Sequence, residues 1–215
     1  YTYTGTTTIS AGTLNVTGTL SDSTAVSVAS GATYIVGAND TVASIAGAGN
    51  ITLTANLTAG TSTDTTFSGV MSSTGSFTKV GSGTLTLSNT NTYTGATTIS
   101  AGTLALSGAG SIATSSGVTA TGTFDISSTT AGTSITTLAG AGTVTLGSKT
   151  LILTAANDTF SGVMDGSGGL TLTGGTQTLA GNNTYTGTTT INAGTFSVTG
   201  ALADSTAVTV ASGAT

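Results

Sequence analysis

The chain has 215 residues, of which only 4% are charged and none is cysteine, histidine, proline or tryptophan. Its formal net charge is −5, and its only basic residues are Lys79 and Lys149. These absences exclude a disulfide framework, a thiolate zinc site and any catalytic arrangement that needs histidine or cysteine. They also leave no basic stripe that could neutralise nucleic acid or an anionic membrane.

The residue types that are present favour β-strands. Threonine makes up about a quarter of the chain, and valine, isoleucine, tyrosine and phenylalanine recur throughout, whereas glutamate, arginine and glutamine are absent or nearly so. The stretches 155–156 and 201–204 are too short to form helices. Threonine and glycine interrupt every apolar stretch before it reaches about 18 residues, so we expect no transmembrane helix.

In chain order, the same small unit recurs. A short stretch that alternates apolar residues with threonine or serine is followed by a corner of small residues with glycine, and then by a second alternating stretch. The alternation predicts half-buried strands, and glycine suits the backbone angles of the corner. The units cover 7–16, 25–36, 43–53, 77–87 and 116–126.

A longer repeat is superimposed on these units. Tyr3–Thr33 and Tyr185–Thr215 differ at only six positions, and Tyr3, Tyr93 and Tyr185 lie 90 and then 92 residues apart. We therefore predict copies at 3–92 and 93–184 and the start of a third at 185–215, within a longer protein. The predicted structural signature of the repeat is Tyr3, Gly5, Gly12, Tyr93, Gly95, Gly102, Tyr185, Gly187 and Gly194.

Short, regularly spaced strands are compatible with a sandwich, a barrel or a solenoid. Near-duplicate copies that suit the stacking of like on like, together with few two-residue hairpin signals, favour the solenoid. We predict an all-β fold, a parallel right-handed β-solenoid (β-helix) that runs continuously over 1–215. With about 4.8 Å between stacked strands, ten or so turns would make a rod roughly 50 Å long.

One segment, Lys79–Leu106, resembles the passenger-associated β-strand repeat of bacterial autotransporters. The positions that carry the resemblance are Lys79, Gly81, Gly83, Thr84, Leu85, Tyr93, Thr94, Gly95, Thr97, Ile99, Gly102, Thr103 and Leu104. The second copy departs from the pattern, with Thr171 where Lys79 stands and Gln177 in place of Leu85. The resemblance implies a right-handed β-helical passenger, exported across the outer membrane of a Gram-negative bacterium and displayed on the cell surface or released.

The repeats and the resemblance lead to three hypotheses. The first is a structural and adhesive surface protein, the rod-like stalk of an autotransporter-like adhesin. The second is a self-assembling extracellular filament, and the third is a β-helical enzyme that acts on polysaccharides. We favour a protein that is not an enzyme, with no cofactor, nucleic-acid partner or membrane insertion. Self-association end to end or side by side, and binding to a host surface, an abiotic surface or a polysaccharide, are left open.

Few residues carry reactive chemistry. The carboxylates that could cleave a glycosidic bond are Asp158 with Asp165, and Asp22 or Asp204 on neighbouring turns. We expect these groups to cap corners and keep the rod soluble. No calcium nonapeptide occurs, and Asp165 followed by Gly166 makes a weak calcium site at best, so we predict no metal ligand.

Two surface hypotheses remain. Thr-x-Thr pairs at 52/54, 84/86, 143/145 and 171/173 resemble ice-binding arrays, but they fall too irregularly for one pair per turn. The recurring Tyr3, Tyr93 and Tyr185 suggest a sugar-binding stripe, against which we favour packing of the ring at a corner.

Overall fold

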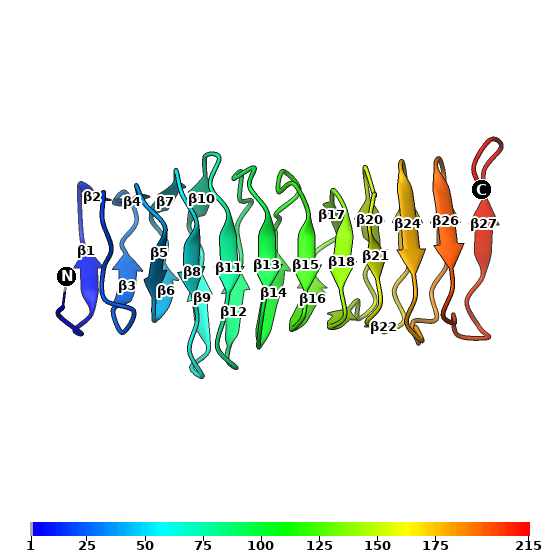
Figure 1. Ribbon diagram of the computed structural model, residues 1–215, viewed down its shortest axis with the longest axis horizontal. Coiled ribbons are helices and arrows are strands. Elements are labelled where there is room, and N and C mark those ends of the chain that lie inside the picture. Colours follow the sequence, from blue (N-terminus) through cyan, green and yellow to red (C-terminus); the bar gives the residue numbers. More distant parts are fainter. Residues whose placement is uncertain (1) are drawn as a thin grey trace.

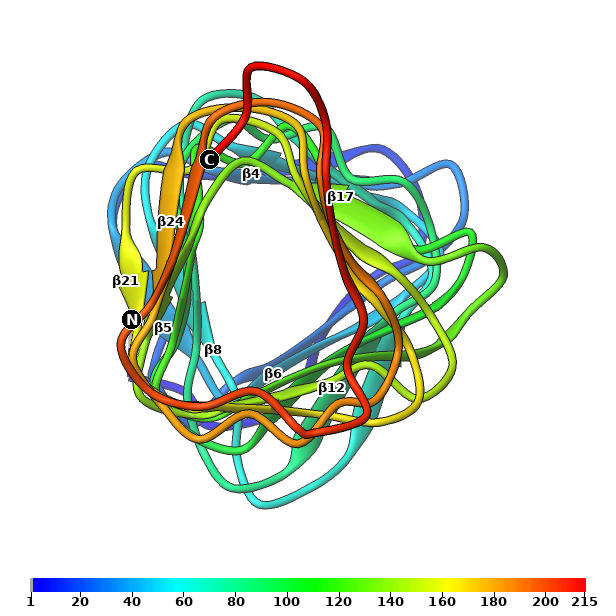
Figure 2. The same cartoon turned by 90° about the vertical axis from the view of Figure 1, so that its right-hand side faces the viewer.

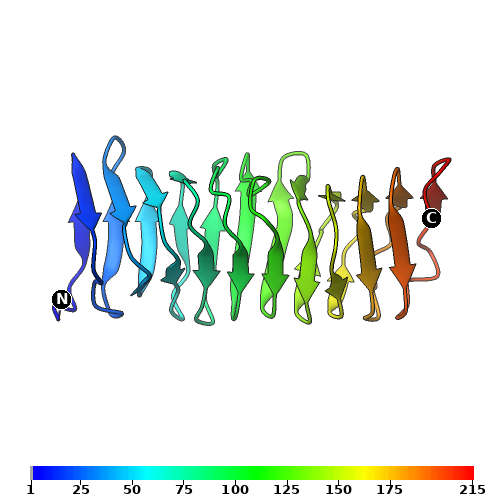
Figure 3. The same ribbon diagram turned by 45° about the horizontal axis from the view of Figure 1, so that its top comes forward.

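The computed structural model describes residues 2–215, and over this range the chain forms strands and turns without a helix. The strands wind into a rod of about 11 turns, here called coils, with the two termini at opposite ends (Figures 1 and 3). Seen along its axis, the rod is a rounded triangle (Figure 2). Buried apolar side chains form one core cluster inside it. The predicted all-β parallel solenoid is confirmed, and its right-handedness stays a prediction.

Two nine-stranded sheets each run along most of the rod. The first sheet consists of β1 (Thr7–Ile9), β3 (Ala25–Val28), β6 (Ser44–Gly47), β9 (Thr65–Phe67), β12 (Thr84–Leu87), β14 (Thr103–Gly108), β16 (Thr123–Thr129), β19 (Thr143–Thr145) and β22 (Val163–Asp165). The third sheet consists of β5 (Asp40–Val42), β8 (Leu57–Ala59), β11 (Phe77–Lys79), β13 (Thr97–Ile99), β15 (Val118–Ala120), β18 (Leu138–Gly140), β21 (Thr159–Phe160), β24 (Thr176–Leu179) and β26 (Thr195–Val198).

Between these two in chain order lie two shorter sheets, one in each half of the rod. The second sheet consists of β2 (Thr13–Val16), β4 (Thr33–Val36), β7 (Asn50–Leu53) and β10 (Val70–Ser72). The fourth sheet consists of β17 (Thr133–Ile135), β20 (Leu151–Leu153), β23 (Leu170–Leu172), β25 (Thr189–Ile191) and β27 (Val208–Val210). No helix among the described residues is long and apolar enough to cross a membrane.

Every coil stacks on the next through parallel pairing. Thr7 pairs with Val26 and Leu104 with Phe124, so a coil of the first sheet takes 19 or 20 residues. Inward positions form continuous apolar columns because the register is kept from coil to coil. One such column is Leu85, Leu104, Phe124, Val144 and Met164, all with 3% exposure or less. This stacked core holds the rod together without any disulfide.

The long repeat is not a whole number of coils, which corrects the expectation that near-duplicate copies stack directly on one another. From β1 to β13 the chain makes four complete coils and then passes two further sides, and the same holds from β13 to β25. The Thr-Thr-Ile strand of the signature consequently lies in the first sheet at β1, the third at β13 and the fourth at β25. Each signature strand therefore stacks on strands from other positions of the repeat, and not on another signature strand.

Candidate binding surface

The signature tyrosine packs inside a corner that leads into a strand. Tyr93 has no exposed surface, and its hydroxyl lies 2.6 Å from Oγ1 of Thr97. Tyr185 is equally buried, with its hydroxyl 2.5 Å from Oγ1 of Thr189. Burial raises the pKa of both phenols. Tyr3 makes the same contact at 2.6 Å but is 44% exposed in the first coil. Because the two internal rings face no solvent, they cannot form a sugar-binding stripe.

A threonine of the next coil binds each signature tyrosine through its main chain. The hydroxyls of Thr24, Thr114 and Thr206 donate to the carbonyl oxygens of Tyr3, Tyr93 and Tyr185, at 3.2, 2.9 and 2.6 Å. Each donor stands 21 residues after its acceptor, which is close to one coil. The signature corner therefore keeps the same contacts on three different sheets.

An asparagine two residues before the tyrosine closes the corner in the two internal copies. Oδ1 of Asn91 accepts from the amide of Met71 at 2.9 Å, and Oδ1 of Asn183 accepts from the amide of Met164 at 3.0 Å. Their Nδ2 groups each donate to two carbonyl oxygens, so these buried amides are fully used. The recurring Asn-Thr-Tyr-Thr-Gly sequence carries this signal.

The first signature glycine is required where two coils touch. A Cβ added at Gly95 or Gly187 would lie 2.3 Å from a carbonyl oxygen of the preceding coil, whereas at Gly5 nothing lies within 4 Å. The second signature glycine turns the chain after the strand, with a positive φ that other residues rarely adopt. These turning glycines are Gly12, Gly102 and Gly194, with φ of 73°, 62° and 88°.

The outward side chains of the strands are mostly threonine. On the third sheet, five consecutive coils place a threonine at the same register, which gives the column Thr41, Thr58, Thr78, Thr98 and Thr119. The Thr-x-Thr pairs of the sequence are scattered: one lies at β7, two at β12 and β19, and one at β23. They therefore occupy three sheets and form no array with one pair per coil.

The four aspartates considered for catalysis do not converge. Asp158 precedes β21 in the third sheet, while Asp165 ends β22 in the first sheet, beyond the corner at Gly162. Asp22 lies in the first coil and Asp204 in the last, so they are at opposite ends of the rod, which corrects their expected place on neighbouring turns. Over residues 2–215, no three aspartate, glutamate, histidine or cysteine side chains gather in a group that could hold a metal ion.

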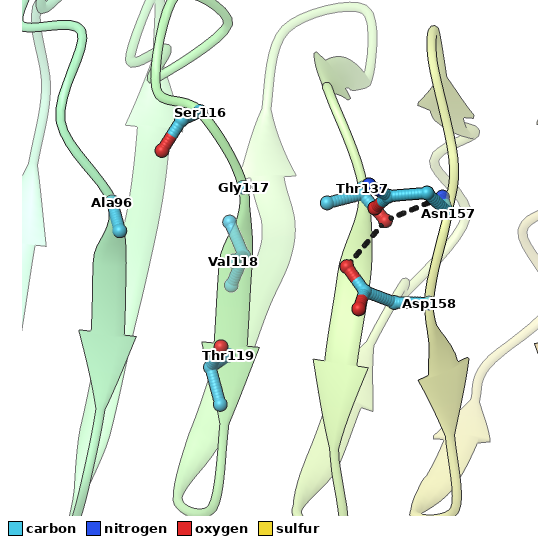
Figure 4. A pocket seen from close by; sticks show the side chains of 8 residues that line it. All are labelled: Ala96, Ser116, Gly117, Val118, Thr119, Thr137, Asn157 and Asp158. Carbon is cyan, nitrogen blue, oxygen red and sulfur yellow. Dashed lines mark hydrogen bonds between the residues drawn. The ribbon is translucent and has the colours of Figure 1, made fainter.

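Asp158 instead lines a shallow groove of about 260 Å³ on the outside of the third sheet. Its Oδ2 accepts a hydrogen bond from Oγ1 of Thr137 at 2.8 Å, and Thr137 Oγ1 in turn accepts from the amide of Asn157 at 3.1 Å (Figure 4). The groove is lined by Ala96, Ser116, Gly117, Val118, Thr119, Thr137, Asn157 and Asp158. It offers hydroxyls and one carboxylate, without an aromatic platform or a base.

Lys79 is buried and caps a corner. Its Nζ donates to the carbonyl oxygens of Val80 at 2.6 Å, Gly81 at 2.9 Å and Ala101 at 3.4 Å. Burial lowers the pKa of this ammonium, against the opposing effect of Asp64.

The second copy forms the corresponding corner without a buried lysine. Its inward residue is Leu172 of β23, because Leu170 and Leu172 face the core as Phe77 and Lys79 do. The sequence comparison that matched Lys79 to Thr171 is therefore wrong by one residue, since the corner after β23 is one residue shorter.

Two further polar groups are buried: Asp40, which was not singled out from the sequence, and Gln177, which was noted there only as a departure from the repeat pattern. The carboxylate of Asp40 accepts from the Tyr34 hydroxyl at 3.0 Å and from the amide of Leu20 at 3.1 and 3.2 Å. Burial, followed by the charge of Asp40, raises the pKa of Tyr34. Gln177, at the core position of Leu85 in the first copy, donates from Nε2 to Leu138 but leaves its buried Oε1 without a partner. Both groups could be found from the sequence as a charged or amide residue at an apolar position of an alternating strand, which indicates a buried polar side chain.

The stacked coils and the internal repeats define a solenoid repeat protein. Residues 1–16, 77–106 and 174–198 match the Passenger-associated-transport-repeat family, and each match contains a signature strand or leads to one. These three segments are therefore autotransporter passenger repeats, as the resemblance of residues 79–106 predicted. This repeat implies a secreted or surface bacterial protein. No curated protein and no solved structure matches the chain.

Proposed function

We propose that this chain is a rod-like structural and adhesive segment of an autotransporter passenger, displayed outside a Gram-negative cell. The observation that carries the proposal is that three passenger-repeat matches fall within one uninterrupted stack of about 11 coils. A stack of parallel strands advances about 4.8 Å per coil, so the fold converts chain length into reach.

The surface of the rod supports an adhesive role. Outward positions carry threonine hydroxyls and methyl groups with very few charges, as in the threonine column of the third sheet. Such a surface can hydrogen-bond to neutral polyhydroxyl or mineral surfaces without paying for the desolvation of ions. Each contact is weak, and many contacts along a rod add through multivalency.

The test of adhesion uses beads coated with the folded chain in shear flow over bare glass, polysaccharide-coated glass and protein-coated glass. We expect retention on at least one surface. A matched variant carrying Thr58→Asp, Thr78→Asp and Thr98→Asp, with unchanged circular dichroism, should detach at lower shear. Equal detachment of coated and uncoated beads on every surface would reject the adhesive role.

Display is tested separately, by fusing the chain to an outer-membrane barrel in a Gram-negative host. We expect an epitope placed at the exposed Thr94 corner to be reached by antibody on intact cells and removed by added protease. Retention of the epitope inside the cell, with the barrel correctly inserted, would count against export of this segment.

End-to-end self-association is a second candidate, favoured by the apolar residues at the last coils. Val198, Val208 and Val210 are 40%, 51% and 51% exposed. β27 presents an unpaired sheet edge, whereas the start of β26 is hydrogen-bonded to Thr215. We expect light scattering to show growth with concentration, and the double variant Val208→Asp, Val210→Asp to stay monomeric. A wild-type chain that stays monomeric at high concentration would remove this candidate.

We propose no catalytic role, because the aspartates lie apart and the groove at Asp158 has a single carboxylate. Glycoside hydrolysis needs two carboxyl groups about 5–10 Å apart across one bond. Turnover of any polysaccharide that is lost in Asp158→Asn would overturn this view.

A further inference from the structure

The 90-residue repeat and the coil of 19 or 20 residues do not share a common period, and this mismatch has a geometric meaning. We infer that the repeat is a screw unit, which carries its signature corner two sides further round the rod with each copy. The rod thereby shows the same corner in three directions. This screw determines how the surface and the length of the rod are built, independently of the adhesive role.

The strand order gives the size of the screw. The signature strand moves from the first sheet at β1 to the third at β13 and the fourth at β25, always after four complete coils and two further sides. One repeat is therefore a rotation of two-thirds of a turn with an advance of four and two-thirds coils. At about 4.8 Å per coil, that advance is about 22 Å, and a corner returns to the same side after about 67 Å.

The contacts of the corner do not depend on the side it occupies. In all three copies the tyrosine hydroxyl meets the threonine four residues on, and the tyrosine carbonyl accepts from the threonine 21 residues on. The residues that flank the tyrosine are exposed in each copy. They are Thr2 and Thr4, Thr92 and Thr94, and Thr184 and Thr186.

This arrangement sets the kind of partner that can use more than one corner. A typical globular receptor covers about 800 Å² on its partner, a patch roughly 30 Å across. It would meet one corner, because the next lies on another side and the next on the same side is about 67 Å away. Only a partner that surrounds the rod, such as a polymer network or neighbouring rods, meets all three.

The screw also predicts that whole repeats are interchangeable across sides. Joining Tyr93 directly to Thr186 removes 94–185, one repeat of 92 residues, and leaves Thr-Thr-Ile after the corner as before. In this shortened chain β25 would take the place of β13, on top of β11 in the third sheet. The matched control removes 94–178, which is fewer residues but not a whole repeat, and joins Tyr93 to Leu179.

Two measurements test this. Circular dichroism with thermal unfolding and size-exclusion chromatography should show a folded, monodisperse chain after removal of 94–185, and an unfolded or aggregated chain after removal of 94–178. Spin labels at Thr8→Cys and Thr190→Cys report on the axial distance, which should fall from about 45 Å to about 22 Å, with the lateral offset added to both. The chain has no natural cysteine, so the labels attach only there.

The result that overturns the inference is a repeat-deleted chain that does not fold, or one that folds no better than the control. An axial distance, obtained after the lateral offset is taken into account, that does not fall by about half would do the same. Because neither measurement involves adhesion, failure here would leave the proposed adhesive role untouched, and failure of bead retention would leave the screw untouched.

Discussion

The closest approach between coils at the signature corner makes a quantitative prediction for Gly95→Ala. The new Cβ would lie 2.3 Å from the carbonyl oxygen of Gly75 and 2.5 Å from its carbonyl carbon, both of them backbone atoms of the preceding coil. The substitution adds no φ strain, since Gly95 does not have a positive φ. Relief therefore requires the two coils to move apart by several tenths of an ångström.

That movement falls on hydrogen bonds that join the same coils. The amide of Gly95 donates to Gly75 at 3.2 Å, and the amide of Thr94 donates to Ser73 at 2.9 Å. Overpacking costs about 1–3 kcal/mol, and weakening one or two backbone hydrogen bonds costs about 1 kcal/mol each. Alanine returns about 0.4–1 kcal/mol by restricting the unfolded chain. The net loss of unfolding free energy is about 1–5 kcal/mol, with a middle value of about 3 kcal/mol, from these three terms together.

The assay is urea unfolding followed by circular dichroism, with amide hydrogen exchange to locate the effect in the coils around Gly95. Two variants at the same signature position serve as controls. Gly187→Ala should lose a similar amount, because its Cβ would also lie 2.3 Å from a carbonyl oxygen, and Gly5→Ala should be neutral or slightly stabilising. If Gly95→Ala and Gly5→Ala change stability equally, the close approach of coils does not explain this glycine.

Three further predictions concern the core and the coil. Stability should fall as pH rises above about 10, because the folded state raises the pKa of buried phenols above the ordinary value of 10.0 that applies when the chain unfolds. The lowered pKa of Lys79 has the opposite effect, because it makes stability rise with pH, but this effect ends at about pH 10.5 and leaves only the fall due to the three phenols above it. Thermal unfolding between pH 8 and 11 checks the sign, and a flat profile would contradict it. The phenols concerned are Tyr34, Tyr93 and Tyr185. Lys79→Met should lower the free energy of unfolding by about 1.5–3 kcal/mol, the value of hydrogen bonds to a charged group. Deleting Ser82 in the same variant reproduces the shorter corner after β23 and should restore part of that loss in urea unfolding. Equal stability of the single and double variants would refute this explanation of the corner. Residues 144–163 make up one coil, because Thr143 pairs with Val163. Removing them should leave a folded rod that is shorter by about 4.8 Å in small-angle scattering, whereas removing 144–153 should prevent folding. Equal behaviour of the two deletions would mean that the coil is not the structural unit of the rod.

Much of the fold could be predicted from the sequence because the signals are local and repeated. The alternation of threonine with apolar residues, the glycine corners at 11–12, 30–32, 47–49 and 81–83, and the lack of proline all point to short stacked strands. The structure places a strand on each side of these corners. The signature tyrosines also stand out, because identical residues recur in identical company.

The pitch of the coil could not be read in the same way. Each coil has three sides, and the corners at residues 37–39 and 54–56 carry no glycine-rich signal as clear as the others. A repeat of 90 residues fits an integral or a fractional number of coils equally well until the pairing of Thr7 with Val26 is known. For the same reason Asp158 and Asp165, seven residues apart, gave no hint that a corner separates them onto different sheets.

The direction of the hydrogen bonds has a mechanical consequence. Because the chain winds around the rod, the bonds between parallel strands run along its axis, and a pull on the two ends loads them directly. Tension would therefore peel off one coil at a time, starting from the ends, where fewer neighbours hold the chain. Each coil of about 20 residues releases roughly 65 Å of extended chain. Under load such a rod would lengthen in steps, and each step would limit the force on the molecule or surface that the rod is bound to.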